Sequence, residues 1–305
     1  MKVKLYLKFL FVVIAVLIVG CNFNEKPITL ATYTYSTNDR IENMKLLSQE
    51  LESSLNREIN VKSYPDVESF ITGIKANEVD IALINTLGYL ILSSDNEHML
   101  PMANMHIEKD AVDNYKTVLL TNNDSIQDYR EINIRAEALT MMFVKEGSTS
   151  GNLVPRLFLS ALDILSPESQ FKEVKYEGNH TSTFEKLLNG ETDLCAIGSN
   201  EYYKQIESDS TLKNRARLLW VSDEIPLGPV LVNKRLTSAE QEKISNLLLN
   251  LHIENSAAFE SIKSGWSEAK QADKFQLLSD EYYNSFREVN GNTTHLDDIL
   301  QMFDN

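Results

Sequence analysis

The sequence predicts an α/β protein of two lobes, each built on a mostly parallel sheet flanked by helices. Strand-like and helix-like segments alternate from residue 28, which is typical of βαβ units. The alternation changes after residue 85, and a second strand-helix-strand set begins near residue 137. A strand-like run over 226–234 then precedes a helical tail. We therefore expect one lobe to be interrupted by another, with two crossings between them.

The N-terminus has the pattern of an export signal. Lysines precede an apolar run from Phe9 to Val19, which is too short for a stable membrane helix. The following Ile-Val-Gly-Cys is similar to a bacterial lipobox, in which the cysteine is lipidated. We expect a lipoprotein signal peptide over 1–20, lipidation of Cys21, and a tether over 21–27 that holds the protein outside the cytoplasm. The alternative is an ordinary signal peptide with an incidental cysteine.

The first lobe starts with a βαβαβ pattern. Between two strand-like runs, apolar residues such as Met44, Leu47 and Leu51 recur at helical spacing. The continuous apolar run that ends at Asn85 indicates a buried strand. We expect strands over 28–35, 59–65 and 80–85, and helices over 39–57 and 67–79.

The pattern then changes: the strand over 114–123 can leave the first lobe, a second strand-helix-strand set follows, and the strand over 226–234 can return to the first lobe. We expect strands over 114–123, 137–145, 171–178, 192–199, 215–224 and 226–234, and helices over 152–165, 182–190 and in several pieces after Thr237. Lobe 1 is then 28–120 with 226–305, and lobe 2 is 121–225, with crossings at Leu119–Asn123 and Ser222–Gly228. Ligands of open α/β sheets bind beyond the carboxyl ends of strands, so the crevice between the lobes is the expected site.

Composition excludes several classes of function. The formal net charge is −15 and becomes more negative without the N-terminal lysines, which disfavours nucleic acid and anionic lipid as partners. Apart from Cys21 the chain has only Cys195, in an apolar run, so we expect an inert buried thiol and no internal disulfide. The five histidines lack the spacing of a metal site. We expect neither metal nor cofactor.

One segment combines glycines and hydroxyl groups where a helix should start. Ser148, Thr149 and Ser150 lie between Gly147 and Gly151, after a predicted strand. Hydroxyl side chains in this position cap helices. A curled loop would also direct amide groups into one concavity, where the helix dipole favours an anion. The residues alone leave both readings open, a plain helix cap or an anion cradle.

The same segment does not have the pattern of an enzyme. Thr149, not a serine, occupies the centre of GSTSG, whereas a nucleophile elbow needs serine there. Ser148 or Ser150 with His180 could form a dyad, but no acid is placed to orient the histidine. We therefore expect binding without catalysis.

Five segments occur in an order and at separations typical of one family. They are YPDVESFITGIKANEVDIALINTLGYL, NYKTVLL, GSTSGNLVPR, EGNHTSTFEKLLNGETDLCAI and IPLGPVLV. Together, from about residue 28 to about residue 250, they resemble the phosphate, phosphite and phosphonate solute-binding proteins of ABC importers, the PhnD-like group. The resemblance implies a type II periplasmic-binding-protein fold, in which two lobes close on a ligand.

The resemblance also implies the ligand contacts. Carried over by position, these are Ser148, Thr149, Ser150 and His180 from one lobe, Tyr115 from the other lobe, and Thr86 on the first-lobe loop that faces the cleft. Four to six charge-assisted hydrogen bonds, at about 1.5–3 kcal/mol each, can exceed the roughly 8 kcal/mol of a micromolar complex. Uncharged donors would then be sufficient without an arginine.

The chain departs from the family at the positions that hold an ammonium group. Members that bind aminoalkyl phosphonates have two acids where this chain has Asn200 and Gly228, and a tyrosine where it has Val67. An unpaired ammonium in a closed cleft costs about 2–5 kcal/mol. Glu201 could substitute only if the register shifts by one residue. We expect the head-group site to persist and aminoalkyl phosphonates to be disfavoured.

These features predict a lipid-anchored, monomeric receptor that delivers a small phosphorus oxyanion to an ABC permease. It would act in the periplasm or at the cell surface. The alternative is a sensory or orphan binding lipoprotein on the same fold, which would present another small ligand to a signalling partner. Neighbouring permease and ATPase genes would favour import, and a kinase gene would favour sensing.

Overall fold

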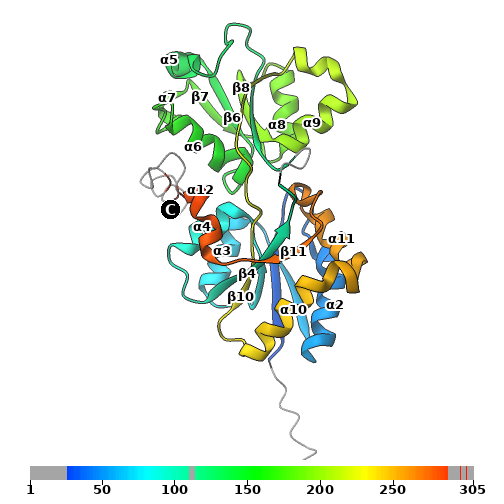
Figure 1. The fold of residues 1–305 in the computed structure, drawn as a ribbon. Helices are drawn as coiled ribbons and strands as arrows, with labels where there is room; N and C mark the ends of the chain where they lie inside the picture. Colours follow the sequence, from blue (N-terminus) through cyan, green and yellow to red (C-terminus); the bar gives the residue numbers. More distant parts are fainter. Residues whose placement is uncertain (1–25, 110–113, 288–295, 297–299, 301–305) are drawn as a thin grey trace, which may run out of the picture.

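Two α/β lobes, one above the other in Figure 1, make up the protein. The computed structural model describes residues 26–109, 114–287, 296 and 300, and it confirms the predicted fold class. The predicted signal peptide, the lipidation at Cys21 and most of the tether lie outside the described residues. Within the described part, no helix is both long and apolar enough to cross a membrane.

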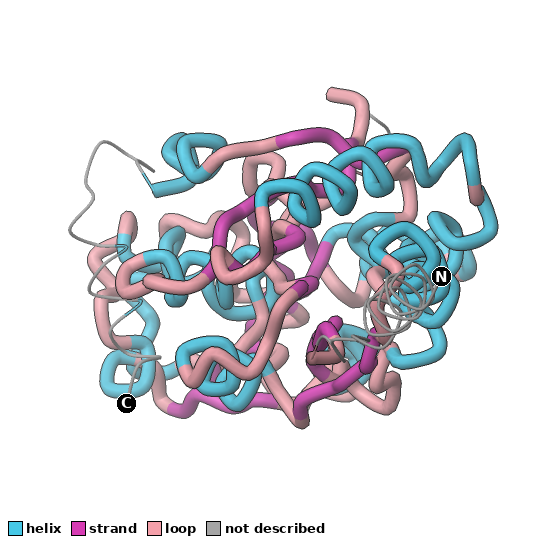
Figure 2. The backbone as a smooth tube through the Cα atoms, turned by 90° about the horizontal axis from the view of Figure 1, so that it is seen from below, coloured by secondary structure: helices cyan, strands magenta, loops and turns pink. Residues whose placement is uncertain are grey.

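Lobe 1 is built on a six-stranded sheet in the order β11-β4-β10-β3-β1-β2. The strands are β1 (Ile28–Tyr33), β2 (Ile59–Tyr64), β3 (Ile81–Leu83), β4 (Met99–His106), β10 (Val230–Asn233) and β11 (Lys274–Leu277). Helices cover both faces of this sheet (Figures 1 and 2). They are α2 (Ile41–Leu55), α3 (Val67–Lys75), α4 (Thr86–Ser93), α10 (Ser238–Glu254) and α11 (Ser256–Gly265), with the short turns η4 (Ser267–Ala269), η5 (Asp280–Tyr283) and α12 (Asn284–Arg287) after them.

Lobe 2 has a five-stranded sheet in the order β7-β6-β8-β5-β9. Its strands are β5 (Thr117–Thr121), β6 (Thr140–Phe143), β7 (Glu173–Tyr176), β8 (Leu194–Gly198) and β9 (Arg217–Val221). Its helices are α5 (Glu131–Arg135), η1 (Ala136–Ala138), η2 (Thr149–Leu153), α6 (Val154–Ser160), α7 (Pro167–Gln170), α8 (His180–Leu188), α9 (Ser199–Ser208) and η3 (Ser210–Asn214).

Both sheets are mixed rather than mostly parallel. In lobe 1, β1 is parallel to β2 and β3, and in lobe 2, β6 is parallel to β7 and β8. The strands added to each block, β10, β4, β11, β5 and β9, pair antiparallel. These strands belong to the crossing segments and the tail, which no βαβ unit constrains to run parallel. The sequence pattern predicted the parallel blocks and missed the antiparallel extensions.

The first crossing lies earlier in the chain than the sequence predicted. Strand Thr117–Thr121 is fully buried between β8 and β9, so it belongs to lobe 2. The chain therefore leaves lobe 1 between His106 and Thr117, not at Leu119–Asn123. The second crossing, between β9 and β10, agrees with the predicted Ser222–Gly228. The crossings run side by side, since the amide of Ile225 donates to the carbonyl of Tyr115 at 2.8 Å.

The C-terminal tail is not entirely helical as predicted. It contributes β11, an edge strand that pairs with β4, and the sequence analysis assigned neither of these strands. The strand β11 has four residues with one fully buried side chain, Phe275, so its apolar pattern is too short to recognise.

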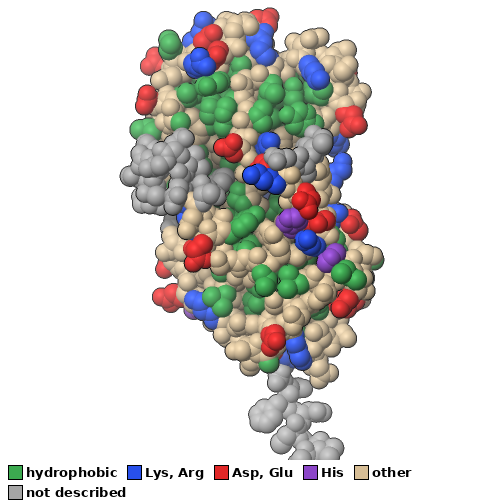
Figure 3. Space-filling model, in the orientation of Figure 1, with side chains coloured by type: hydrophobic (Ala, Val, Ile, Leu, Met, Phe, Trp, Pro, Cys, Tyr) green, Lys and Arg blue, Asp and Glu red, His purple; other side chains and the backbone are tan. Residues whose placement is uncertain are grey.

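Apolar cores lie on both faces of each sheet. One core packs α2, α10 and α11 against the lobe 1 sheet. The core on the opposite face contains residues of α3 and α4 together with Leu153, Val154 and Leu157 of lobe 2, so the lobes are joined by apolar contact. Cys195 is buried in the lobe 2 sheet, and burial raises its thiol pKa, as expected for an inert thiol. On the face of the molecule that Figure 3 shows, acidic and basic side chains are interspersed.

Candidate functional site

A cavity of about 640 Å³ lies between the lobes, at the carboxyl ends of strands from both sheets. The segments after β1, β2 and β3 form its lobe 1 wall, and the segments after β6, β7 and β8 form its lobe 2 wall. Lobe 1 contributes Tyr33, Tyr35, Arg40, Asp66, Val67, Asn85 and Glu268 among others, and lobe 2 contributes Lys145, Ser148, Thr149, Arg156, His180 and Asn200 among others. The volume is that of a small-molecule site.

The lobes touch around this cavity. The Asn85 side-chain amide donates to the carbonyl of Gly147 at 2.8 Å, and the Leu87 amide donates to Oγ1 of Thr149 at 3.1 Å. Beyond them, the side-chain amide of Asn200 donates to the carbonyl of Ser267 at 3.0 Å. These contacts join loops that follow β3, β6 and β8, so the cavity is enclosed by both lobes at once.

The hydroxyl segment starts a helix and also lines the cavity. Ser148 is the cap, because its Oγ accepts from the amide of Gly151 at 3.0 Å. The first turn is a π-turn, in which Leu153 donates to the Ser148 carbonyl at 3.1 Å, and it continues into α6. The amides of Thr149 and Ser150 precede that first helical bond, as the unsatisfied amides of a helix start do. The two readings of the sequence, cap and cradle, are therefore compatible.

The three hydroxyl groups differ in their surroundings. Ser148 and Thr149 line the cavity. Since Oγ1 of Thr149 accepts from Leu87, its own hydroxyl proton is available to a ligand. Ser150 lies deeper and is not among the lining residues, and its buried hydroxyl lies beside the phenol of Tyr115.

His180 is the first residue of α8, and its ring faces the cavity. Its Nδ1 accepts from the amide of Gly198 at 3.0 Å, so the neutral ring carries its proton on Nε2. Burial lowers the pKa of His180 to about 4, although the charge of Glu201 acts in the opposite direction. His180 is therefore an uncharged donor at neutral pH. A Cβ built on Gly198 would lie 3.3 Å from Ser150 Oγ and 3.6 Å from His180 Cε1, so these groups converge there.

We expect His180 to make the fold acid-sensitive. Its pKa is about 4 when folded against an ordinary 6.5, so the unfolded chain takes up the proton first as the pH falls. The stabilisation is complete above about pH 6.5 and is lost progressively towards pH 4. In His180→Gln, the amide oxygen of the glutamine can still accept from Gly198, but the side chain does not titrate. This variant should therefore not lose stability from this source between about pH 6.5 and pH 4. Melting temperatures of both proteins across that range test this, and parallel curves would contradict it.

Tyr115 lies at the first crossing and lines the cavity. Burial, followed by the charge of Glu268, raises the pKa of its phenol well above the ordinary value, so it is a protonated donor. Thr86, in contrast, does not line the cavity. It is 1% exposed, and its hydroxyl donates to the carbonyl of Pro226 at 2.5 Å, where it fixes the second crossing to α4. Its neighbour Asn85 occupies the cavity wall instead.

The two positions that the resemblance assigns to the ammonium site differ in the structure. Asn200 lines the cavity, but Gly228 lies against backbone, where a Cβ would meet the Ile84 carbonyl oxygen at 1.9 Å. Glu201 does not substitute for an acid, since its carboxylate accepts from Thr181 and Gln205 and is not part of the cavity wall. A different carboxylate, that of Glu268 in η4, does line the cavity.

Several lining residues were missed by the sequence analysis, among them Tyr35, Arg40 and Glu268. Arg40 precedes α2, Tyr35 follows β1 and Glu268 comes from the tail. The phenol oxygen of Tyr35 is buried beside the backbone of His180. No local motif marks these positions, because each reaches the cavity only through the tertiary fold.

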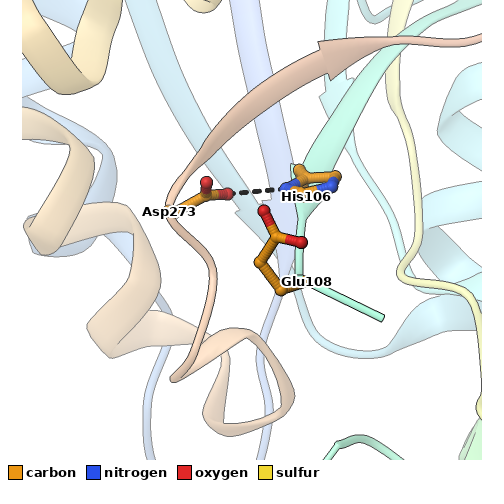
Figure 4. A group of neighbouring side chains, drawn as sticks. All are labelled: His106, Glu108 and Asp273. Carbon is orange, nitrogen blue, oxygen red and sulfur yellow. Dashed lines mark hydrogen bonds and ion pairs between the residues drawn. The ribbon is translucent and has the colours of Figure 1, made fainter. Parts of the chain in front are cut away.

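A group of possible metal ligands lies outside the cavity (Figure 4). His106 at the end of β4 bonds through Nδ1 to Asp273 at 2.7 Å, and Glu108 completes the group. Their potential ligand atoms lie within 4.8 Å of one another. Sequence spacing could not reveal the group, because Asp273 is far from His106 in the chain. The His106–Asp273 pair also joins β4 to β11 directly.

The chain matches known proteins over most of its length. Residues 30–277 match the family model described as ABC transporter, phosphonate, periplasmic substrate-binding protein. The phosphonates-binding periplasmic protein of Escherichia coli (strain K12) is 26% identical over 247 residues, which cover 80% of this chain and 71% of that protein. The probable ABC transporter phosphite binding protein of Prochlorococcus marinus (strain MIT 9301) is 21% identical over 68% of this chain and 71% of that protein.

Solved structures support the same fold. The binding protein of an ABC phosphonate transporter from Pseudomonas aeruginosa has a TM-score of 0.66 and 18% identity, covering 92% of this chain and 97% of that one. The Prochlorococcus marinus protein in complex with methylphosphonate has a TM-score of 0.68 and 18% identity, covering 87% and 97%. These relatives are binding components of transporters and not enzymes. The chain belongs to the family of periplasmic substrate-binding proteins of phosphonate ABC transporters.

Proposed function

We propose that this protein captures a small phosphorus oxyanion, such as a phosphonate, phosphite or phosphate, and delivers it to an ABC permease. We further propose that it acts as a monomer anchored by lipid at Cys21 on the extracytoplasmic face of a membrane. The anchor proposal rests on the lipobox-like sequence alone.

The observation that carries the ligand proposal is the convergence of uncharged donors on one cavity. The amides at the start of the π-turn, the hydroxyl of Thr149 and Nε2 of His180 come from lobe 2, and the phenol of Tyr115 comes from the crossing. A tetrahedral oxyanion has several acceptor atoms, and hydrogen bonds to a charged group contribute about 1.5–3 kcal/mol each. A helix start additionally favours negative charge.

The relatives support the same ligand class. The matched solved structure from Prochlorococcus marinus holds methylphosphonate, and both curated relatives are described as binding phosphonates or phosphite. A hydrolase is not supported, because the His180 Nδ1 is bonded to the Gly198 amide and Ser148 Oγ accepts from Gly151. No carboxylate in the described residues orients the histidine ring.

A thermal-shift screen tests the proposal. Purified protein without residues 1–21 would be heated with phosphate, phosphite, methylphosphonate or sulfate. A ligand at a hundred times its Kd should add about 2.7 kcal/mol to the free energy of unfolding. We expect a clear rise in melting temperature with at least one phosphorus anion and a smaller rise with sulfate. Equal responses to all four anions, or no response, would contradict the proposed ligand class.

A further inference from the structure

Arg40 is a buried guanidinium in the cavity wall without a carboxylate partner. The residue is only 2% exposed, and the hydrogen bonds of its guanidinium to described residues go to backbone carbonyls rather than to a carboxylate. Its Cζ lies 4.6 Å from the ring centroid of Tyr33 and 4.4 Å from that of Trp266. Cation–π contacts offset some of the cost of burying this charge, but they supply no negative charge.

The hydrogen bonds of Arg40 fix it in place. Nε donates to the carbonyl of Gly265 at 2.9 Å, and Nη1 donates to the carbonyl of Tyr33 at 3.4 Å. Gly265 is the last residue of α11, where the helix dipole favours a cation. These two bonds use Nε and Nη1, and the phenol of Tyr33 also lies beside the guanidinium. The guanidinium is therefore held rigidly, with its charge available to an anion.

Glu268 is the complementary case. It lines the same cavity two residues after Trp266, and its carboxylate makes no hydrogen bond or ion pair with the described residues. Its charge acts on the phenols of Tyr33, Tyr35 and Tyr115, whose pKa values are raised mainly by burial and further by Glu268. Arg40 and Glu268 thus both line the cavity from lobe 1, as do Asp66, Glu68 and Lys75, and Arg40 and Glu268 do not form an ion pair with each other.

This pair is near the head-group donors of lobe 2. The ring of Tyr35 is 5.5 Å from the guanidinium carbon of Arg40, and it is 6.1 Å from the ring of His180. A ligand that reaches from His180 past Tyr35 therefore needs only a few bonds beyond its head group. The cavity of about 640 Å³ has room for such a substituent.

We propose that Arg40 and Glu268 form a subsite for a zwitterionic substituent, in which Arg40 binds a carboxylate and Glu268 binds an ammonium. The ligand class is then a phosphorus acid whose carbon chain bears an amino-acid group. The inference rests on the proposed function, because lobe 2 must hold the phosphorus head group. It also replaces the expectation drawn from Asn200 and Gly228, since Glu268 supplies an acid from outside those positions.

Four ligands whose carbon chains bear neither, one or both of the charged groups test the subsite. Isothermal titration of the full-length protein in detergent would compare methylphosphonate, phosphonoacetate, 2-aminoethylphosphonate and 2-amino-3-phosphonopropionate. We expect the last to bind at least about tenfold more tightly than methylphosphonate, since each charged group gains a charge-assisted hydrogen bond. Equal affinities of these two ligands would overturn the proposal.

Two variants assign the gains to residues. Arg40→Gln should remove the gain from the carboxylate and keep the gain from the ammonium, and Glu268→Gln should do the reverse. A purely structural role of Arg40 would lower the melting temperature but leave the ratio of affinities for phosphonoacetate and methylphosphonate unchanged, which would refute its assignment. If Arg40→Gln does not fold, Arg40→Lys retains the charge without the planar fork, and it should lose part of the same ratio.

The subsite and the proposed function can be refuted separately. If methylphosphonate binds and neither charged group adds affinity, only the subsite is wrong. If no phosphorus anion binds the unaltered protein, the proposed function is wrong as well. A uniform loss for all four ligands in Arg40→Gln would mean that Arg40 acts on the head group, which also overturns the subsite.

Discussion

Replacing Thr149 with valine should weaken methylphosphonate binding by at least about tenfold. Valine has nearly the shape of threonine but no hydroxyl, so a donor to the oxyanion is lost, at about 1.5–3 kcal/mol. The Leu87 amide also loses its acceptor, Thr149 Oγ1, across the lobe interface. A buried amide without a partner costs about 1–3 kcal/mol. Because this contact joins the lobes, the substitution should weaken binding in two ways: it removes a donor to the ligand and a hydrogen bond between the lobes.

Thr149→Ser is the matched control. It keeps the hydroxyl that serves both Leu87 and the ligand and removes only a methyl group, so we expect its affinity to remain within a few-fold of the unaltered protein. Calorimetric titration of both variants separates the hydroxyl from the shape of the side chain. Equal losses in the valine and serine variants, or retention of affinity in valine, would exclude Thr149 as a ligand donor.

The cavity-lining positions of Ser148 and Thr149 were predictable because their signals are local, whereas Ser150 does not line the cavity. The hydroxyls at 148–150 lie next to one another, and their place between a strand and a helix follows from the apolar pattern. Sequence reasoning failed at Thr86, which is adjacent to the cavity but uses its hydroxyl on Pro226. Asn85 and Thr86 are neighbours at the start of α4, and the rotation of the helix start decides which of their side chains faces the cavity. No pattern in the sequence determines that rotation.

The places of Arg40 and Glu268 in the cavity wall could not be predicted, because they depend on contacts between distant parts of the chain. Arg40 is bonded to Gly265 and lies between Tyr33 and Trp266, so its position depends on a contact across 225 residues of sequence. Glu268 belongs to a short turn after α11, in the tail where the family resemblance was only one of helical character. In isolation, both residues have the sequence context of ordinary surface charges.

The fold shows the same division between local and non-local information. The parallel blocks around β1 and β6 follow from strand-helix alternation. The assignment of Thr117–Thr121 to lobe 2 depends on its partners β8 and β9, which are not neighbours in sequence. The apolar pattern can therefore identify β5 as a strand but cannot say to which sheet it belongs.

Replacing Gly228 with alanine should lower the free energy of unfolding by about 3 kcal/mol. A Cβ at this position would lie 1.9 Å from the Ile84 carbonyl oxygen and 2.6 Å from the Asn85 Cα. These are backbone atoms that cannot rotate away, and overpacking in such places typically costs about 1–3 kcal/mol and occasionally more. The displaced segment carries Asn85 and Leu87, which contact lobe 2, so binding should weaken together with stability.

Gly265→Ala is the comparison, because the atoms nearest to its Cβ would belong to the Asn43 side chain, at 3.1 Å. That neighbour can move slightly, so we expect a change within about 1 kcal/mol. Urea unfolding followed by tryptophan fluorescence measures both variants. Similar midpoints would mean that the second crossing can shift to admit a side chain. If instead Gly228→Ala is severely destabilised, an aspartate at 228 could not rebuild the family's ammonium site, and an acid for that charge would have to come from elsewhere in the cavity wall, as Glu268 does.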